Sequence, residues 1–463
     1  MSTPLPDPVF QRICKQVDAS GGDILGFLSR LVSFPTPTQN PEDKNYPDAI
    51  RACHAFLSEA LKGMGFTLDT WMARPMSFPE HPVLVGTLKG SGGGHSMALN
   101  GHVDVVPAGD EGAWKHSPWG GEVTDGRLWG RGACDMKGGV AAMIQAVKAI
   151  RDCGLRLRGD VYVHVVSDEE VVGFGSRECA ERAPRPDFVL VTEPTRLNVL
   201  PVEGGLEHVR IEIEGREEHA GRRYSSIYPR EADRGHGVNA VEKGVQIVRA
   251  LQDLERSWAL SKSHPLLPAG FNTLLPGIFM SGPGGGSGGQ LNMITNPGTT
   301  PNYCCIEYNI WYYPQETLDE IKRDVEGYVN AISRYDPYLK AHPPKFTWGL
   351  RNISFPPANT DPDHEVVNSL LSSLQRLGCP SQITGFNAAS DLAWYAARGI
   401  PGAIFGPGDL ACAHSPDEFV PVSDTLNVTK AIALALLSWC GYETYPPSPL
   451  PKGKGEQTCL TGR

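Results

Sequence analysis

Apolar residues in the first part of the chain recur at the spacing of a helix. This pattern predicts a helix over residues 10–33, which ends at a proline-rich segment, and a second helix over Ala49–Met64. Shorter apolar runs then predict strands at Thr67–Met72 and His81–Lys89, and a further strand that ends near Leu99. The chain therefore begins with helices and continues into a sheet.

Two later apolar runs end in acidic residues. Asp160–Val166 runs directly into Ser167-Asp168-Glu169-Glu170, and Phe188–Val191 runs into Thr192-Glu193. A single acidic residue after a strand is usually a helix cap or part of a solvated turn. Two such strands favour a shared site, because open α/β sheets bind ligands at the carboxyl ends of their strands.

The pattern changes near residue 203. His208–Glu214 alternates apolar and polar residues, as a strand with one solvated face does. Helical and strand patterns follow at Asn239–Trp258, Phe271–Phe279, Asn302–Tyr313 and Glu316–Ser333. This order is typical of a small α+β domain with an antiparallel sheet. The α/β character then resumes, with elements predicted at Glu365–Leu377, Gly399–Phe405 and Val428–Trp439.

These patterns predict one domain inserted into another. Residues 1–202 and 344–463 would form the larger α/β domain, and residues 203–343 would form the inserted α+β domain. A chain of 463 residues is long enough for two or three domains with a large core.

Composition excludes several classes of function. The net charge of −10 argues against a general binder of nucleic acid or anionic membranes. We find neither a run of about 20 apolar residues nor the apolar core of a signal peptide, so we expect a cytoplasmic protein. The 11 cysteines form no Cys-x-x-Cys pair, which fits free thiols in a reducing compartment.

The candidate chemistry begins with a His-x-Asp pair. His102 and Asp104 follow the strand that ends near Leu99, and residues two apart in extended backbone project from the same face. Asp135 lies in a glycine-rich loop that enters a helix, which suits a metal ligand approaching from another direction. The complete candidate set is His102, Asp104, Asp135, Glu169, Glu170, Glu193 and His414.

Histidines and carboxylates without a cysteine suit zinc, with cobalt or manganese as alternatives. The set holds more carboxylates than one tetrahedral ion needs, so we predict two divalent ions that share one carboxylate. Two ions about 3.5–4 Å apart can acidify a water and polarise a carbonyl. One carboxylate must stay free to move the proton of that water.

Several motifs carry a family resemblance that spans about residues 20–440. They are GHVDVVP, GRGACDMKGG, SDEEVVGFGS, VTEP, EEHAG and AHSPDE. Together they resemble the acetylornithine deacetylase, succinyl-diaminopimelate desuccinylase, aminoacylase and carboxypeptidase G family of dinuclear metallo-amidohydrolases. The resemblance implies a three-layer α/β/α zinc-exopeptidase-like catalytic domain and an inserted ferredoxin-like domain that serves as lid and dimerisation domain.

The resemblance also implies a role for each candidate residue. Asp135 would bridge two ions, with a cis peptide bond after it. His102 and Glu193 would complete one coordination sphere, and Glu170 and His414 the other. Asp104 would orient the His102 ring, and Glu169 would be the general base and acid.

In the inserted domain, the resemblance implies that His219 enters the active site of the partner in a homodimer and stabilises the oxyanion. Asn292 corresponds to an asparagine that contacts substrate. Many relatives carry an arginine near Ile306–Tyr313, where this chain has Trp311 and no arginine. Arg222 and Arg223, in an arginine-rich loop of residues 222–235, would supply another anion clamp or belong to a solvated loop.

We therefore expect a metal-dependent hydrolase of the amide bond in a small N-acyl amino acid or related N-acylated compound. A dipeptidase or carboxypeptidase on the same site is the first alternative, and a deformylase of small heterocyclic amides is another. A catalytically inactive relative that binds a small molecule is the alternative outside enzymes. Such a relative would have lost a ligand or the base, and this chain retains them all.

Overall fold

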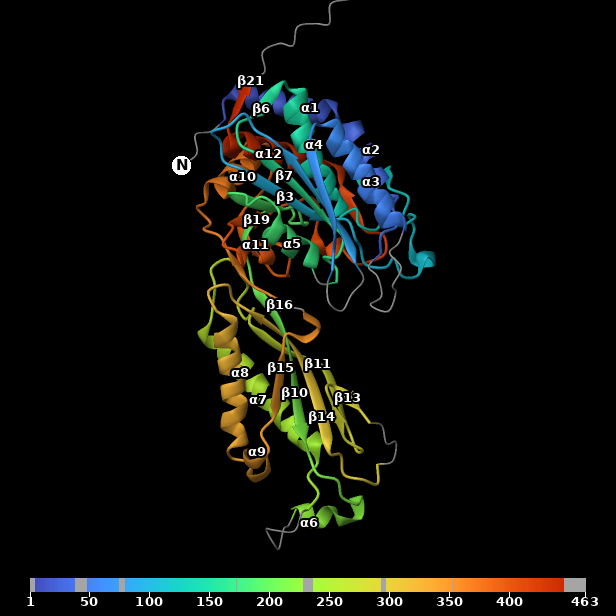
Figure 1. Ribbon diagram of the computed structural model, residues 1–463, viewed down its shortest axis with the longest axis vertical. Coiled ribbons are helices and arrows are strands. Elements are labelled where there is room, and N and C mark those ends of the chain that lie inside the picture. The colour runs from blue at the N-terminus through green and yellow to red at the C-terminus, as the bar shows by residue number, and fades with distance from the viewer. Residues whose placement is uncertain are drawn as a thin grey trace, which may run out of the picture.

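A nine-stranded sheet forms the centre of the larger of two parts of the computed structural model (Figure 1). The structure describes residues 5–37, 48–74, 80–171, 173–227, 236–292, 297–352 and 354–444. The main path of the sheet is β1-β2-β7-β3-β8-β19-β9-β17, and β18 pairs with β9. Its strands are β1 (Thr67–Ala73), β2 (His81–Leu88), β3 (Met97–His102), β7 (Val161–Val166), β8 (Phe188–Val191), β9 (Val199–Glu203), β17 (Ala358–Asn359), β18 (Ile383–Phe386) and β19 (Gly402–Ile404).

The central strands of this sheet are parallel. β3 pairs in parallel with both β7 and β8, and β19 pairs in parallel with β8. Every residue of β3, β7 and β8 is buried, as expected of strands covered on both faces. The carboxyl ends of β3, β7 and β8 therefore meet at one edge of the sheet, where the acidic residues of the sequence follow.

Helices cover both faces and complete three layers. The helices of the larger part are α1 (Asp7–Ala19), α2 (Gly21–Val32), α3 (Asp48–Gly63), α4 (Lys137–Asp152), α5 (Phe174–Arg182), α10 (Glu365–Arg376), α11 (Leu392–Ala396) and α12 (Val422–Cys440). α4 and α12 pack against each other and against β3, whereas α5 and α11 pack together elsewhere on the sheet. The expected three-layer α/β/α fold is confirmed.

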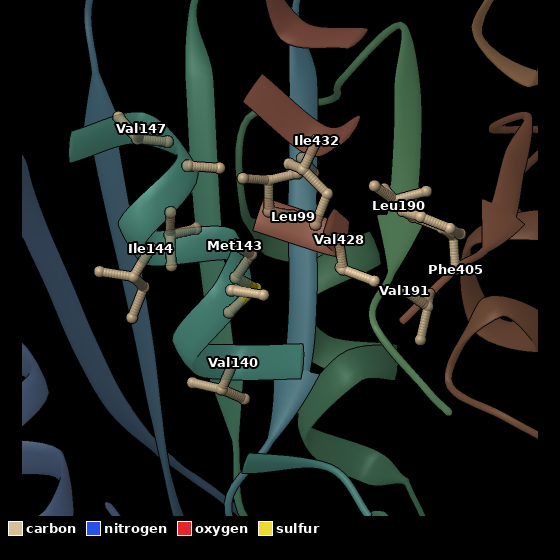
Figure 2. Packing of buried hydrophobic residues seen from close by; sticks show 14 of the residues in the cluster. Leu99, Val140, Met143, Ile144, Val147, Leu190, Val191, Phe405, Val428 and Ile432 are labelled. Atoms are coloured by element: carbon tan, nitrogen blue, oxygen red, sulfur yellow. The ribbon is translucent and has the colours of Figure 1, made fainter. Parts of the chain in front are cut away.

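The core beneath the site is aliphatic. Figure 2 shows Val140, Met143, Ile144 and Val147 of α4 beside Leu99 of β3. All five of these side chains are no more than 1% exposed. Burying such side chains stabilises the fold by about 1.5–3 kcal/mol each. The rigid strand and helix that precede and follow the candidate ligands are thus held by packing.

The prediction of one helix over residues 10–33 is wrong, because this segment forms two helices. α1 ends at Ala19 and α2 begins at Gly21, with Ser20 between them. Two consecutive glycines, Gly21 and Gly22, follow the break, and glycine is a poor residue for a helix interior. The apolar spacing continues across the break, so periodicity alone does not reveal it.

The second part contains a five-stranded antiparallel sheet with the order β11-β14-β10-β15, and β16 also pairs with β10. Its elements are β10 (Gly205–Glu214), α6 (Arg223–Ile227), α7 (Ala240–Ser261), β11 (Thr273–Gly282), β12 (Gly286–Ser287), β13 (Gln290–Leu291), β14 (Tyr303–Tyr312), α8 (Leu318–Ser333), α9 (Pro337–Ala341), β15 (Lys345–Trp348) and β16 (Ser354–Phe355). Side chains of α7 and α8 share a core with one face of this sheet.

The inserted part extends beyond residue 343, where we expected it to end. β15 and β16 both lie after that residue and pair with β10. Each is too short for its apolar pattern to predict a strand. The remaining short strands belong to small sheets of the larger part: β4 (Glu122–Thr124), β5 (Arg127–Trp129), β6 (Leu155–Leu157), β20 (Phe419–Pro421) and β21 (Tyr442–Thr444).

Within the described ranges, no helix has the length and apolar character that a membrane span requires.

Candidate metal centre

His102 is the last residue of β3 and is fully buried at the edge of the sheet. Its Nδ1 lies 2.9 Å from the carbonyl oxygen of Asp104. A carbonyl oxygen only accepts, so we assign the proton to Nδ1, which leaves the lone pair of Nε2 directed at the other candidate residues. The backbone of Asp104 thus selects the ring tautomer that a metal ligand needs.

The carboxylate of Asp104 lies near both the His102 ring and the loop after β7. It lies 3.4 Å from His102 Nδ1, farther than the Asp104 carbonyl oxygen. Its two oxygens accept hydrogen bonds from the backbone N–H groups of Glu169, at 3.4 Å, and Glu170, at 3.1 Å. Asp104 therefore fixes the loop after β7 relative to the end of β3.

Asp135 lies between two histidines, in the loop that enters α4. Its Oδ1 is 3.2 Å from His102 Nε2, and its Oδ2 is 3.3 Å from His414 Nε2. The peptide bond from Asp135 to Met136 is cis, as the resemblance implies. A carboxylate that presents one oxygen to each of two imidazoles is arranged as a bridging ligand would be.

The carboxyl ends of β7 and β8 supply the other acidic groups. Glu193 Oε1 lies 3.5 Å and Glu169 Oε2 lies 3.8 Å from His102 Nε2. Glu170 lies on the opposite side, with Oε2 at 3.1 Å from His414 Nε2. The three glutamates therefore divide between the two histidines, two near His102 and one near His414.

His414 reaches the cluster from a loop far along the chain. Its backbone φ is +59°, in the left-handed region that residues other than glycine seldom adopt. Such conformations cost of the order of 1–3 kcal/mol and concentrate at functional sites. The imidazole is about half exposed, with 52% of its side-chain surface accessible. His414 thus forms the solvent-facing side of the cluster.

Burial and mutual repulsion shift the pKa values of the acidic groups. Burial raises the pKa of Glu193 to about 8, with the charge of Asp135 adding to the effect. Burial also raises the pKa of Glu169 well above its usual range and raises that of Glu170. Hydrogen bonds to Asp135 and Glu170 raise the pKa of His414 to about 10. The cluster therefore favours positive charge at its centre.

The donor set fits divalent cations. Donor atoms of His102, Asp135 and Glu170 all lie within 4.8 Å of one another, and so do those of His102, Glu169 and Glu193. Imidazole and carboxylate ligands suit zinc, cobalt and manganese. Glu169 lies close enough to His102 and Glu193 to be a ligand on that side, and it is also the candidate base.

The candidate residues of the inserted part lie away from this cluster. The segment that leads from His219 into α6 lies at the end of the inserted part opposite the large sheet (Figure 1). His219 is exposed, and its Nδ1 accepts a hydrogen bond from the Gly221 N–H. Asn292 is also exposed and donates to the carbonyl oxygen of Gly284 at 3.2 Å.

The two candidate arginines of that segment form ion pairs. Arg222 Nε lies 3.1 Å from Glu218 Oε1, and Arg223 contacts the carboxylate of Glu242. Residues 228–235 of the arginine-rich loop lie outside the described ranges. The geometry therefore gives these arginines local partners in the inserted part and does not bring them to the cluster.

Two buried carboxylates near the cluster were missed by the sequence analysis. Asp391 is fully buried and accepts a hydrogen bond from Ser176 Oγ at 2.7 Å. Glu418 is 1% exposed and accepts a hydrogen bond from the backbone N–H of Asp135 at 3.1 Å. Glu418 belongs to the motif AHSPDE, but its spacing gives no sign that it contacts residues in the first third of the chain.

A three-layer fold with histidines and carboxylates at the carboxyl edge of its sheet has the residues to hold divalent ions at its ligand-binding edge. The model for peptidase family M20/M25/M40 matches residues 98–438. The chain therefore belongs to this family, and the expected family and enzyme class are confirmed.

Named relatives resemble the chain over nearly its full length. The N-formyl-4-amino-5-aminomethyl-2-methylpyrimidine deformylase of Bacillus subtilis (strain 168) is 33% identical over 438 residues, 92% of this chain and 96% of the relative. A deformylase of the same name from Halalkalibacterium halodurans is 30% identical, over 93% of this chain and 98% of the relative. An acetylornithine deacetylase of Vibrio cholerae is 25% identical, over 88% and 96%.

Solved structures confirm the fold. The di-peptidase Dug1p of Saccharomyces cerevisiae is similar with a TM-score of 0.65 and 15% identity, over 93% of this chain and 98% of that one. The YXEP protein of Bacillus subtilis, described as a dinuclear metal binding peptidase, has a TM-score of 0.60 and 15% identity, over 91% and 99%. At this identity the likeness concerns architecture alone.

Proposed function

We propose that this chain is a deformylase that hydrolyses the N-formyl amide of a small aminomethylpyrimidine or a similar amino-heterocycle. The observation that carries the proposal is the 33% identity to a deformylase of this type over 92% of the chain, compared with 25% to an acetylornithine deacetylase. The sequence first suggested an N-acyl amino acid or a related N-acylated compound as substrate. The proposed substrate is the N-formyl amide of a small heterocycle, which was one of the alternatives.

The inserted sheet supports a substrate without a carboxylate. β14 carries Trp311 rather than an arginine, and this ring packs edge-on against Phe271 at 5.8 Å between centroids. Two arginines near β14, Arg210 and Arg351, both bind Glu307, at 2.8 and 3.2 Å. A guanidinium already paired with a carboxylate is a weak candidate for binding a second one.

We assign the ligands of two divalent ions from the resemblance and the distances above. Asp135 would bridge them, His102 and Glu193 would hold one, and Glu170 and His414 would hold the other. We favour zinc, with cobalt or manganese as alternatives. When bound, such ions supply a water of lowered pKa and polarise the carbonyl of the amide.

Glu169 would serve as general base and acid. It would take a proton from the attacking water and deliver it to the nitrogen of the amide as the C–N bond breaks, so that formate and the free amine leave. The hydrogen bond from its own N–H to Asp104 fixes its backbone. Burial raises the pKa of Glu169, which makes its carboxylate a stronger base than an exposed one.

His219 would act in a homodimer. Helix α6, which begins four residues after His219, lies at the end of the inserted part opposite the large sheet (Figure 1), so stabilisation of the oxyanion would need His219 of the partner subunit. Asn292 would contact substrate from the same part. Arg222 and Arg223 would then contribute only if their ion pairs opened.

The ten cysteines of the described ranges have free thiols, which supports a cytoplasmic location.

The test is a panel of N-formyl, N-acetyl and N-succinyl amines, including amino-heterocycles, amino acids and dipeptides, assayed with zinc, cobalt or manganese. We expect metal-dependent release of formate from the heterocyclic amide with the highest kcat/KM of the panel. Faster release of an amino acid or a dipeptide product would replace the proposed substrate class.

A further inference from the structure

Glu418 joins the two loops that carry Asp135 and His414. It lies four residues after His414, and its Oε1 accepts hydrogen bonds from the consecutive N–H groups of Cys134, at 3.0 Å, and Asp135, at 3.1 Å. The carbonyl oxygen of Glu418 also accepts from the N–H of Gly130 at 2.8 Å. One residue of the His414 loop thus holds the backbone of the Asp135 loop at three points.

The second oxygen of Glu418 is held by a buried arginine. Arg131 Nη1 lies 2.5 Å from Glu418 Oε2, and both side chains are 3% exposed or less. The Arg131 guanidinium also lies over the ring of Trp114, 5.1 Å from its centroid. A buried carboxylate near Asp135 would be costly without a counter-charge, and Arg131 supplies it.

These contacts restrict the orientation of Asp135. Its backbone N–H is fixed by Glu418, and its two carboxylate oxygens face imidazoles of different loops at 3.2 and 3.3 Å. If the backbone turned, both oxygens would move together, because they share one side chain. A change at Glu418 would therefore disturb both sides of the cluster at once.

We propose that Glu418, neutralised by Arg131, is the positioning residue that orients Asp135 toward both candidate ion sites. The inference rests on the proposed metal site and adds a residue to it. Groups that orient metal ligands typically change metal affinity by about 10–100-fold when they are removed.

A Glu418→Gln variant separates this role from mere packing. Glutamine keeps the size of the side chain but accepts hydrogen bonds at only one end. It must therefore leave either the two N–H groups or Arg131 facing its NH2 group. Both sets of donors are buried with Glu418, so solvent cannot replace the acceptor that is lost.

The neighbouring residue gives a matched control. Asp417 Oδ1 also accepts two consecutive backbone N–H groups, those of Lys115, at 2.7 Å, and His116, at 3.3 Å. Its other oxygen lies 4.0 Å from the exposed Lys115 Nζ. Asparagine can keep the contacts of Oδ1 and tolerates the left-handed φ of +56° at this position. Asp417→Asn therefore changes the same loop without changing the Asp135 loop.

The experiment is calorimetric titration of the chelator-treated full chain with Zn²⁺, together with the visible absorption spectrum after loading with Co²⁺. We expect Glu418→Gln to weaken the binding of both ions by at least about tenfold and to change the cobalt spectrum. Asp417→Asn should have the same affinities and spectrum as wild type. If Glu418→Gln does not fold, Glu418→Leu combined with Arg131→Met, which removes both buried charges together with the acceptor of the two N–H groups, gives the same comparison.

The outcomes separate the two proposals. Wild-type affinities and spectrum in the Glu418 variants, with wild type binding two ions, would overturn the positioning role and leave the proposed function in place. A loss of one ion alone would also overturn it, because Asp135 faces both sides. A wild-type chain that binds no ion would overturn the proposed function as well.

Discussion

Asp135 presents one carboxylate oxygen to His102 and the other to His414, at 3.2 and 3.3 Å. The two histidines come from the first and last thirds of the chain, so the fold must close around the inserted part before they meet. The bridging geometry is thus a product of the complete larger domain.

Asp135→Asn should abolish binding of both ions. The amide presents an NH2 group to one of the two sites, and the neutral side chain no longer offsets two dications. His414→Ala removes a ligand from one side only, so one ion should remain. Metal content per chain after dialysis measures both effects, with the exposed Asp152→Asn as control. Two ions retained by Asp135→Asn would contradict the bridging role.

Glu169→Gln should retain both ions and lose turnover. A general base typically contributes about 10²–10⁴-fold to the rate, so kcat should fall by that factor with the fold unchanged. Glu181→Gln, on the exposed side of α5, is the control. Loss of an ion from the Glu169 variant would instead make Glu169 a ligand, a role that its 3.8 Å distance from His102 Nε2 leaves open.

A heterodimer tests whether His219 acts across the dimer. One chain carries Glu169→Gln and the other carries His219→Ala, and each homodimer should be nearly inactive. The heterodimer should regain activity, because one of its sites combines an intact Glu169 with His219 of the partner subunit.

The matched control for this test places both substitutions on one chain, paired with a wild-type chain. The same residues are changed, but no site then has both groups, so we expect no recovery. Activity in this control but not in the first heterodimer would show that His219 acts within its own chain and not in trans. A fully active monomer in sedimentation would exclude the arrangement altogether.

His164 should make the protein less stable in acid. It is fully buried in β7, where its Nδ1 lies 2.7 Å from Tyr395 Oη, and burial lowers its pKa from 6.5 to about 3. Above pH 6.5 the ring is neutral in both the folded and the unfolded chain, so its titration does not reduce the free energy of unfolding. As the pH falls from 6.5 toward 3, the unfolded chain binds a proton that the folded chain resists, so stability is lost.

The loss should be about 1.4 kcal/mol for each pH unit below 6.5. Urea unfolding of chelator-treated protein at pH 7.5 and pH 5 measures it. His164→Gln cannot titrate, so its free energy of unfolding should fall less than that of wild type by about 2 kcal/mol. Equal losses in the two proteins would exclude His164 as a source of the acid sensitivity.

The sequence predicted the strands that carry the site because β7 and β8 are uninterrupted apolar runs with acidic residues directly after them. Parallel strands bring such ends to one edge, so the sequence alone could place Glu169, Glu170 and Glu193 together. His102 was predicted as a site residue because it pairs with Asp104 in a His-x-Asp motif. His414 was predicted only from its family motif, since a lone loop histidine has no pattern of its own.

The contacts that support the ligands were beyond prediction. Glu418 and Arg131 are distant in sequence, and nothing in their spacing indicates a buried ion pair. The carbonyl oxygen of Asp104, rather than its carboxylate, contacts His102 most closely, and backbone groups leave no mark in a residue pattern. β15 was not predicted because a run of four residues is too short to show a distinct alternating pattern.

The most direct test of the central claim is hydrolysis of an N-formyl aminomethylpyrimidine by chelator-treated protein as Zn²⁺ or Co²⁺ is added back in known amounts. We predict that formate release is absent without metal, rises with added metal and levels off at two ions per chain. Full activity in the presence of chelator, or no hydrolysis with two ions bound, would contradict the account.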